Sequence, residues 1–291
     1  MTINLILQGP DAATDTLHRI AALAAPARTV PLGEHALRAE GIALSDPLRQ
    51  SVELAAHGAG LDATFIEAGR TLADFRLVAM DMDSTLITIE CIDEIADMQG
   101  LKPQVAAITE SAMRGELDFA ASLTRRVALL EGLDAAALER VYTERLAISM
   151  GGEAMLAGVK AAGLKTLLVS GGFTFFTERL KSRLGLDYTH ANVLEIVDGK
   201  LTGRVVGGIV DAEEKMRTVQ RVCADLGIDA RQAIVMGDGA NDLKMMGIAG
   251  LSVAFRAKPV VRAQADVALN FSGLDGLLAI LPAGQAAAGS A

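Results

Sequence analysis

Aromatic residues are scarce in this chain of 291 residues: they make up 3% of it, and tryptophan is absent. With few aromatic surfaces on which bases can stack, the composition argues against single-stranded nucleic acid as a partner. The formal net charge of −9 also disfavours binding to a nucleic-acid backbone. A small phosphate ester remains a suitable ligand, because local charge rather than net charge decides whether it binds.

Cysteines and long apolar runs are also few. Cys91 and Cys223 have neither CxxC spacing nor neighbouring metal ligands, which predicts two buried thiols in a reducing compartment. Residues 1–20 lack the basic start and apolar stretch of a secretory signal. No uninterrupted apolar run is long enough to cross a bilayer. We therefore expect a soluble cytoplasmic protein without a membrane partner.

What the chain does contain is enough apolar sequence for a large core, with 51% hydrophobic and 22% charged residues. Residues 1–74 alternate short strand-like and helix-like patterns in the order β-α-β-β-α-β, which predicts a small ferredoxin-like α+β domain. Asp46 is expected to cap its second helix, with Pro47 in the first turn. Gly9-Pro10-Asp11 marks a turn after the first strand.

The rest of the chain predicts an α/β domain over residues 75–282, with a flexible tail at 283–291. Short apolar runs alternate with helical patterns, which indicates a Rossmann-like, doubly wound parallel sheet. The expected strands are residues 76–81, 165–170, 233–237 and 251–254. Residues 91–147 read as an inserted helical cap after the first strand, and Asp198-Gly199 predicts a hairpin turn.

The first of these strands ends at two aspartates, Asp81 and Asp83, separated by one methionine. Side chains two apart on an extended strand point to the same face, so both carboxylates are expected in one pocket. Two like charges held together are unfavourable unless a cation or a proton offsets them. The spacing alone also fits a calcium-type acidic loop or a solvated turn, but its position after a buried strand favours a functional site.

The ends of two other strands carry residues of matching chemistry. Ligands of wound parallel sheets bind beyond the carboxyl ends of the strands, so these segments should meet. Gly237-Asp238-Gly239-Ala240-Asn241-Asp242 adds two carboxylates to the aspartate pair, which together suit Mg²⁺. Ser170-Gly171-Gly172 precedes a helix and offers a hydroxyl and backbone N–H groups to an anion, although this signal is weak alone. Lys215, alone, fits an ordinary solvated helix start.

Together these groups match phosphoryl transfer through an aspartyl-phosphate. One aspartate attacks phosphorus, and a second carboxylic acid protonates the leaving oxygen and then activates water. Cations and N–H donors neutralise the phosphoryl oxygens. The pKa of free aspartic acid is about 3.9, so the acid requires a raised pKa, which we expect from a neighbouring carboxylate and a closed cap.

The segment Asp81-Met82-Asp83-Ser84-Thr85 resembles the nucleophile motif of haloacid dehalogenase-like phosphatases. Ser170, Lys215 and the Gly237–Asp242 cluster are similar to the other three motifs of that superfamily, in order and spacing, and the likeness runs from about residue 76 to about residue 281. Within the superfamily the chain is most similar to the enzymes that act on phosphoserine. Further segments carry that likeness: residues 92–96, 113–119, 122–127, 170–173 and 184–188, together with Glu90.

The resemblance implies a role for each matching residue. Asp81 would be the nucleophile and Asp83 the general acid and base. Mg²⁺ would be held by Asp81, the backbone carbonyl of Asp83, and Asp238, with Asp242 supporting the metal or Lys215. The phosphate would be held by Ser170, Gly171 and Lys215, with Asn241 near the phosphate or the attacking water. Glu90 would bind the substrate ammonium and Arg126 its carboxylate, with Met113 and Phe119 lining the cap.

Three other interpretations stay open at this point. A phosphotransferase or mutase would use the same aspartyl-phosphate, and a phosphatase could act on another small phosphorylated metabolite. A carbon–halogen hydrolase is disfavoured, since its chemistry has no leaving oxygen for Asp83 to protonate. Residues 1–74 faintly resemble an amino-acid-binding ACT-type domain, which would suit a regulatory protein. The sequence leaves open a homodimer through this domain and the range of substrates.

Overall fold

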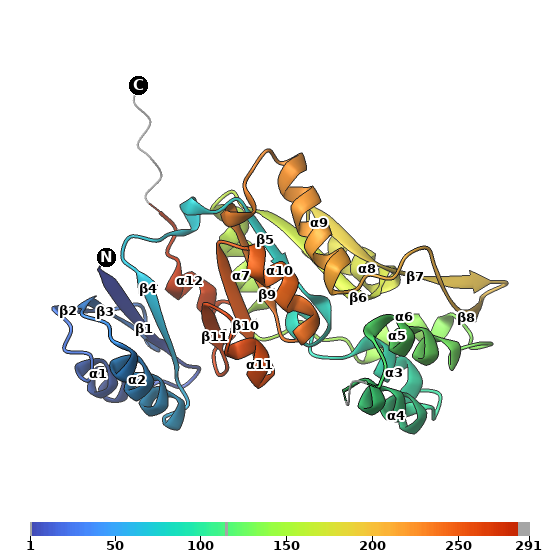
Figure 1. Ribbon diagram of the computed structural model, residues 1–291, viewed down its shortest axis with the longest axis horizontal. Coiled ribbons are helices and arrows are strands. Elements are labelled where there is room, and N and C mark those ends of the chain that lie inside the picture. The colour runs from blue at the N-terminus through green and yellow to red at the C-terminus, as the bar shows by residue number, and fades with distance from the viewer. Residues whose placement is uncertain (1, 114–115, 285–291) are drawn as a thin grey trace.

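The computed structural model describes residues 2–113 and 116–284, arranged as two sheets and a set of inserted helices (Figure 1). The first sheet has the strand order β2-β3-β1-β4, and its pairs are antiparallel. Together with two helices it has the predicted β-α-β-β-α-β order of a ferredoxin-like fold. Its elements are β1 (Ile3–Gln8), α1 (Thr14–Ala22), β2 (Arg28–Pro31), β3 (Ala36–Ile42), α2 (Asp46–Gly58) and β4 (Asp62–Glu67).

Alternate residues of this first sheet face two different layers, as the period of a strand requires. Leu5 and Leu7 of β1 pack with α1 and α2, whereas Ile6 joins the core of the larger unit. One local prediction is wrong: Ser45 caps α2 by accepting a hydrogen bond from Leu48 N, and Asp46 is the first helical residue. A serine hydroxyl is as good an N-cap acceptor as a carboxylate, so the sequence alone did not separate the two.

The second sheet has the order β11-β10-β9-β5-β6-β7-β8 and is parallel except for its edge strand β8, which runs antiparallel to β7. The predicted parallel sheet is therefore confirmed. The short strand β11 lay outside the four predicted runs. The strands are β5 (Leu77–Met80), β6 (Lys165–Phe173), β7 (Tyr188–Val197), β8 (Lys200–Val206), β9 (Ala233–Gly237), β10 (Leu251–Phe255) and β11 (Val267–Leu269).

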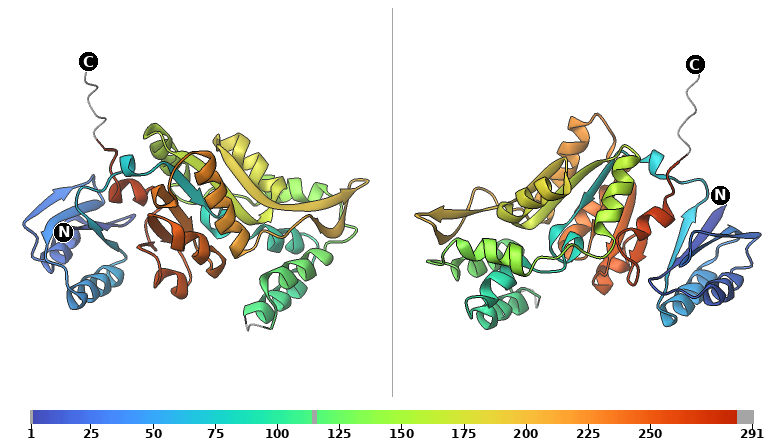
Figure 2. Two further views of the ribbon diagram at one scale, coloured as in Figure 1. Left: turned by 45° about the horizontal axis from the view of Figure 1, so that its top comes forward. Right: turned by 180° about the vertical axis from the view of Figure 1, so that it is seen from behind.

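Helices cover both faces of this sheet, which makes it doubly wound (Figures 1 and 2). In β5, Leu77 and Ala79 pack with the α9 and α10 layer, whereas Val78 and Met80 pack with the α7, α8 and α12 layer. A strand buried on both faces reads as a continuous apolar run, which is how β5 appears in the sequence. The helices are α7 (Gly152–Ala161), α8 (Thr174–Leu184), α9 (Ala212–Asp225), α10 (Leu243–Ile248), α11 (Pro259–Arg262) and α12 (Gly276–Ile280).

Between β5 and α7 lie the inserted helices α3 (Cys91–Asp97), α4 (Lys102–Met113), α5 (Phe119–Ala128) and α6 (Ala136–Glu144). We call this set the cap. The hairpin β7–β8 extends from the core sheet and lies beside the cap (Figure 2). Backbone hydrogen bonds join the two: Gly132 N donates to Leu201 O, and Leu201 N donates to Leu133 O, each at 2.8 Å. The turn has positive φ at Asp198 and Gly199, as the predicted hairpin requires.

The two sheets are joined by a buried carboxylate. Asp62, 2% exposed, accepts hydrogen bonds from the backbone N–H groups of Asn270, Phe271 and Ser272 just after β11. Gln8 adds a hydrogen bond to Gly276 O.

Cys91 and Cys223 are both free and buried, as expected. Among the described residues, no helix is both long and apolar enough to span a membrane. Most of the predicted tail, from residue 285, lies outside the described residues.

Candidate active site

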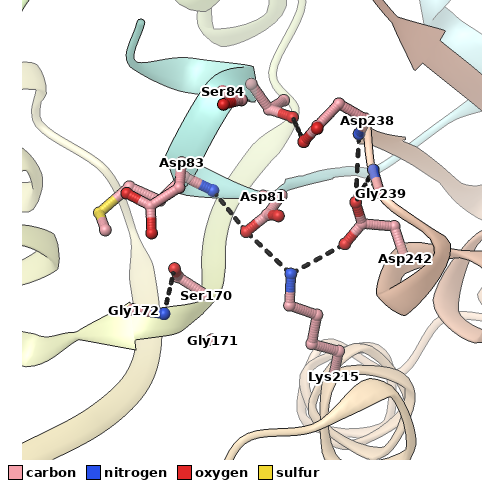
Figure 3. A network of polar contacts seen from close by, with 12 residues as sticks. Asp81, Asp83, Ser84, Ser170, Gly171, Gly172, Lys215, Asp238, Gly239 and Asp242 are labelled. Atoms are coloured by element: carbon pink, nitrogen blue, oxygen red, sulfur yellow. Dashed lines mark hydrogen bonds and ion pairs between the residues drawn. The ribbon is translucent and has the colours of Figure 1, made fainter. Parts of the chain in front are cut away.

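Asp81 follows the last residue of β5 and is 5% exposed. Its Oδ1 atom accepts a hydrogen bond from Met82 N at 2.7 Å and lies 2.8 Å from the Nζ atom of Lys215 (Figure 3). The chain then turns away, with Ser84 at a φ of +55°, a left-handed conformation that is rare outside glycine. The strand ends at Met80 and this turn spans Met82–Leu86, so extended geometry does not continue through Asp83. Asp81 and Asp83 nevertheless line one cavity, as predicted.

Asp83 is enclosed by the first turn of the cap and by the Ser170–Gly172 segment of β6. Its Oδ1 atom accepts a hydrogen bond from Cys91 N at 3.2 Å. Its Oδ2 atom lies where a side chain on Gly172 would collide with it, 2.7 Å from the position of a Cβ. Burial raises the pKa of Asp83 to about 7, helped by the charge of Glu90 and opposed by the hydrogen bonds from Cys91. The raised pKa expected of an acid catalyst is thus present.

Lys215, from α9, lies between two carboxylates and is fully buried. Its Nζ atom is 2.8 Å from Asp81 Oδ1 and 2.8 Å from Asp242 Oδ1 (Figure 3). Burial disfavours the ammonium, but the two carboxylates outweigh burial and raise the pKa of Lys215 above its usual value. The lysine therefore stays charged and offsets part of the negative charge collected at the strand ends.

Three carboxylates form an acidic cluster at the ends of β5 and β9: oxygens of Asp81, Asp238 and Asp242 lie within 4.8 Å of one another. Asp242 is already engaged, because one oxygen contacts Lys215 and the other accepts from Asp238 N and Gly239 N at 3.1 and 3.0 Å. Asp238 accepts one hydrogen bond from Thr85 Oγ1 at 3.1 Å. Asp81 and Asp238 keep an oxygen each outside these contacts, so the donor set fits a divalent metal ion.

The loop after Val169 of β6 supplies an anion-binding corner opposite the acidic cluster. Ser170 is 1% exposed, and its Oγ atom accepts a hydrogen bond from Gly172 N at 2.8 Å (Figure 3). The serine hydroxyl proton is therefore available to a ligand in the cavity. A Cβ on Gly171 would come within 2.7 Å of the Phe119 ring, so this glycine is needed where the cap meets the loop.

The cap supplies the other end of the same cavity, whose volume is about 590 Å³. Arg126 lines it from α5, and its buried Nε atom has no partner among the described residues. Burial lowers the pKa of Arg126, and the negative charges of Asp93 and Glu90 partly offset this shift. Glu90 lies at the cavity wall and accepts a hydrogen bond from Ser84 Oγ at 2.7 Å. A cation and an anion thus line the same cavity as the anion-binding corner.

The structure brings nearly all the residues of the predicted site to this place. Those that line the cavity are Asp81, Asp83, Glu90, Phe119, Arg126, Ser170, Gly171, Asp238 and Asn241. Lys215 and Asp242 lie behind the cavity wall, where they contact Asp81 and the Asp238 loop. Met113 ends α4, but its side chain lies outside the described residues, so its role in the cap stays a prediction.

Several groups make contacts in this site that sequence reasoning did not predict. Ser84 and Thr85 entered the sequence analysis only as part of the nucleophile-like motif, yet each donates a hydrogen bond to a carboxylate of the predicted site. Gly172 packs against Asp83, and Asp93 and Lys258 line the cavity. Hydroxyl residues directly after a catalytic pair were a usable signal. Asp93 lay in a segment that carried the family likeness but received no role of its own, and nothing in the sequence around Lys258 distinguished it from a surface charge.

The chain was compared with protein families and with solved structures. The family model for haloacid dehalogenase-like hydrolases matches residues 78–247. A phosphoserine phosphatase of Polaromonas is 59% identical over 215 residues, which cover 72% of this chain and 91% of that protein. A crystal structure of a haloacid dehalogenase family hydrolase from Salmonella enterica serovar Typhi has a TM-score of 0.88 at 32% identity, covering 97% of this chain and 98% of that one. A structure of a substrate-bound phosphoserine phosphatase has a TM-score of 0.67 at 37% identity, covering 71% and 98%.

Proposed function

The chain belongs to the haloacid dehalogenase-like hydrolases and, within them, to the phosphoserine phosphatases, and we propose that it hydrolyses O-phospho-L-serine to L-serine and phosphate. The observation that carries the substrate assignment is Arg126, which lines the same cavity as Glu90 and Ser170 and whose buried Nε has no hydrogen-bond partner among the described residues. Phosphoserine has a phosphate, an ammonium and a carboxylate. The cavity offers a group of opposite character to each of them.

In this proposal Asp81 is the nucleophile. Its carboxylate attacks phosphorus, the bond from phosphorus to the serine oxygen breaks, and the phosphoryl group is carried on Asp81 until water releases it. Lys215, held 2.8 Å from Asp81, orients the carboxylate and offsets the charge that accumulates on the phosphoryl oxygens. The hydroxyl of Ser170 and the backbone of Gly171 hold the phosphoryl group on the opposite side.

Asp83 is proposed as the acid and then the base. It donates its proton to the leaving serine oxygen and, once ionised, takes a proton from the water that attacks phosphorus. The hydrogen bond from Cys91 N, at the start of α3, fixes one of its oxygens and leaves the other directed past Gly172. Asn241 lines the same cavity and is proposed to contact the phosphate or the attacking water.

Mg²⁺ is the divalent ion that we propose for the acidic cluster, because carboxylate oxygens beside a substrate phosphate are its preferred ligands. Asp81, Asp238 and the backbone carbonyl of Asp83 would hold it, and when bound it would withdraw charge from the phosphoryl oxygens. Asp242 is proposed to support Lys215 and the Asp238 loop rather than the ion, since both its oxygens are already engaged.

The remaining proposals concern the context of the enzyme. We propose the division into residues 1–74, residues 75–282 with the cap at 91–147, and a tail at 283–291. Two free buried thiols support a reducing, cytoplasmic location. Strand β2 at the end of the first sheet is where a second copy could add, which supports a homodimer through residues 1–74.

One assay tests the function and its main alternative together. The protein is given phosphoserine with Mg²⁺, and phosphate release is compared with that from O-phosphoethanolamine and a phosphorylated hydroxy acid. We expect the highest kcat/KM for phosphoserine, because each of the other esters lacks one of its two charged groups. A phosphotransferase would instead pass the phosphoryl group to an added alcohol or amino acid with little free phosphate, and that outcome would replace hydrolysis as the assigned reaction.

A further inference from the structure

The loop that carries Ser170 and Gly171 is an irregularity in the pairing of two parallel strands. Val169 of β6 is opposite His190 of β7, but the next pair is Phe173 with Asn192. Three residues of β6 therefore face a single residue of β7, and the surplus chain forms the Ser170–Gly172 bulge. A bulge re-aims the chain locally and requires something to fix its orientation.

Asn192 is opposite Phe173 in the pair that closes the bulge, and it is 1% exposed. Its Nδ2 group donates a hydrogen bond of 2.8 Å to Gly171 O in the bulge. Its Oδ1 atom accepts a hydrogen bond of 2.8 Å from Val210 N, just before α9 begins. One buried amide thus joins the bulge to the segment that leads to Lys215. A buried amide is favourable only when such hydrogen bonds are made.

The hydrogen bond to Gly171 O controls more than one group. The peptide between Gly171 and Gly172 is planar, so fixing its carbonyl also fixes the direction of Gly172 N–H. That N–H donates to Ser170 Oγ at 2.8 Å. With this acceptor position occupied, the hydroxyl proton of Ser170 is left for a ligand. Asn192 itself is not among the residues that line the cavity.

We propose that Asn192 is a positioning residue of the phosphate-binding corner. It holds the Gly171–Gly172 peptide in the orientation that lets Gly172 N–H donate to Ser170 Oγ, and so directs the serine hydroxyl at the phosphate. Through Val210 it also sets the distance between this corner and the helix that carries Lys215. The inference rests on the proposed function only in taking a phosphate group as the ligand of this corner.

The test measures binding of inorganic phosphate to the full-length protein by isothermal titration calorimetry. Asn192→Asp keeps the size and the acceptor for Val210 N–H but places an oxygen against Gly171 O. We expect its phosphate affinity to fall about 10-fold or more, the usual cost of leaving a buried polar partner unpaired. Ser252→Ala is the matched control. Ser252 is a buried residue of β10 that is hydrogen-bonded to Asp266 and does not line the cavity. This variant should bind phosphate as the unaltered protein does.

A double-mutant cycle separates positioning from general support of the fold. If Asn192 acts through Ser170, then Asn192→Asp should weaken phosphate binding little further when Ser170→Ala is already present. Additive losses would overturn the proposal, and so would unchanged phosphate affinity in a folded Asn192→Ala or Asn192→Asp protein. If the protein binds phosphate but does not hydrolyse phosphoserine, the proposed function alone is contradicted. If it hydrolyses phosphoserine and the Asn192 variants bind phosphate as tightly as the unaltered protein, this inference alone is contradicted.

Discussion

Lys215 and Asp242 form an ion pair of 2.8 Å in which both side chains are fully buried. The pair is part of a longer chain of contacts, since the same ammonium lies 2.8 Å from Asp81 and the same carboxylate binds the backbone of the Asp238 loop. A buried pair is maintained only while both partners are present, because removing one leaves an uncompensated charge. The central cation of the site is therefore also an element of its stability.

Lys215→Met should abolish catalysis and weaken the fold. With the ammonium removed, Asp81 and Asp242 repel each other in a buried place, at a cost of about 3–5 kcal/mol. Activity should fall by at least about a thousandfold, and urea unfolding should shift to lower concentration. The control is Lys244→Met on α10, whose lysine forms an exposed pair with Glu213 that contributes little. Equal effects of the two substitutions would contradict the role given to Lys215.

Arg126→Ala should change substrate preference rather than the chemistry. The variant leaves the substrate carboxylate without its partner, a loss of about 2–5 kcal/mol, or on the order of 30- to several-thousand-fold in kcat/KM for phosphoserine. O-phosphoethanolamine has no carboxylate, so its kcat/KM should fall far less. The measurement is the ratio of the two values in each protein. If kcat/KM fell by the same factor for both esters, Arg126 would not bind the substrate carboxylate.

Chelation of divalent metal should stop turnover. Asp81, Asp238 and Asp242 bring three carboxylates within 4.8 Å with one buried lysine among them, so a further cation is needed when a phosphate group enters. Phosphate release should vanish in EDTA and return with excess Mg²⁺. Asp238→Asn should raise the Mg²⁺ concentration needed for half-maximal rate. Undiminished activity in EDTA would exclude the metal site.

Asp62→Ala should destabilise the protein while leaving kcat/KM unchanged. Asp62 accepts hydrogen bonds from three consecutive N–H groups at residues 270–272, none of which lines the cavity, and the loss of these bonds should cost about 2–3 kcal/mol. Asp11→Ala, at an exposed position of the same unit, is the control and should not shift thermal unfolding. Deleting residues 1–74 should expose the same N–H groups and lower stability likewise. A stable Asp62→Ala protein would show that this contact is dispensable.

The sequence predicted the parts of the site that follow from strand ends. Asp81 follows β5, Asp238 follows β9, and Ser170 lies near the C-terminal end of β6. The C-terminal ends of the strands of a wound parallel sheet lie along one edge, so these residues meet. Local signals also located the hairpin turn at Asp198-Gly199 and most helices of the cap. These features depend on short-range pattern, which a single sequence contains.

Other features depend on contacts between distant segments and were not predictable in this way. Asn192 is an ordinary polar residue in a strand until Gly171 and Val210 are placed around it. Leu201 of β8 is joined to the cap by backbone hydrogen bonds, which a pattern of side chains does not predict. The edge strand β11 has three residues, too few for alternation to be recognised.

The central claim is that Asp81 carries the phosphoryl group of phosphoserine during turnover. The most direct measurement is acid quenching of the protein during reaction with phosphoserine and Mg²⁺, followed by mass spectrometry of its peptides. Asp83→Asn lacks both the proton donor for the leaving oxygen and the base for water, so it should form the phosphorylated peptide more slowly than the unaltered protein. We predict a phosphorylated peptide in which Asp81 is the modified residue, absent from Asp81→Asn. Rapid phosphate release with no phosphorylated Asp81 in the unaltered protein would contradict the account.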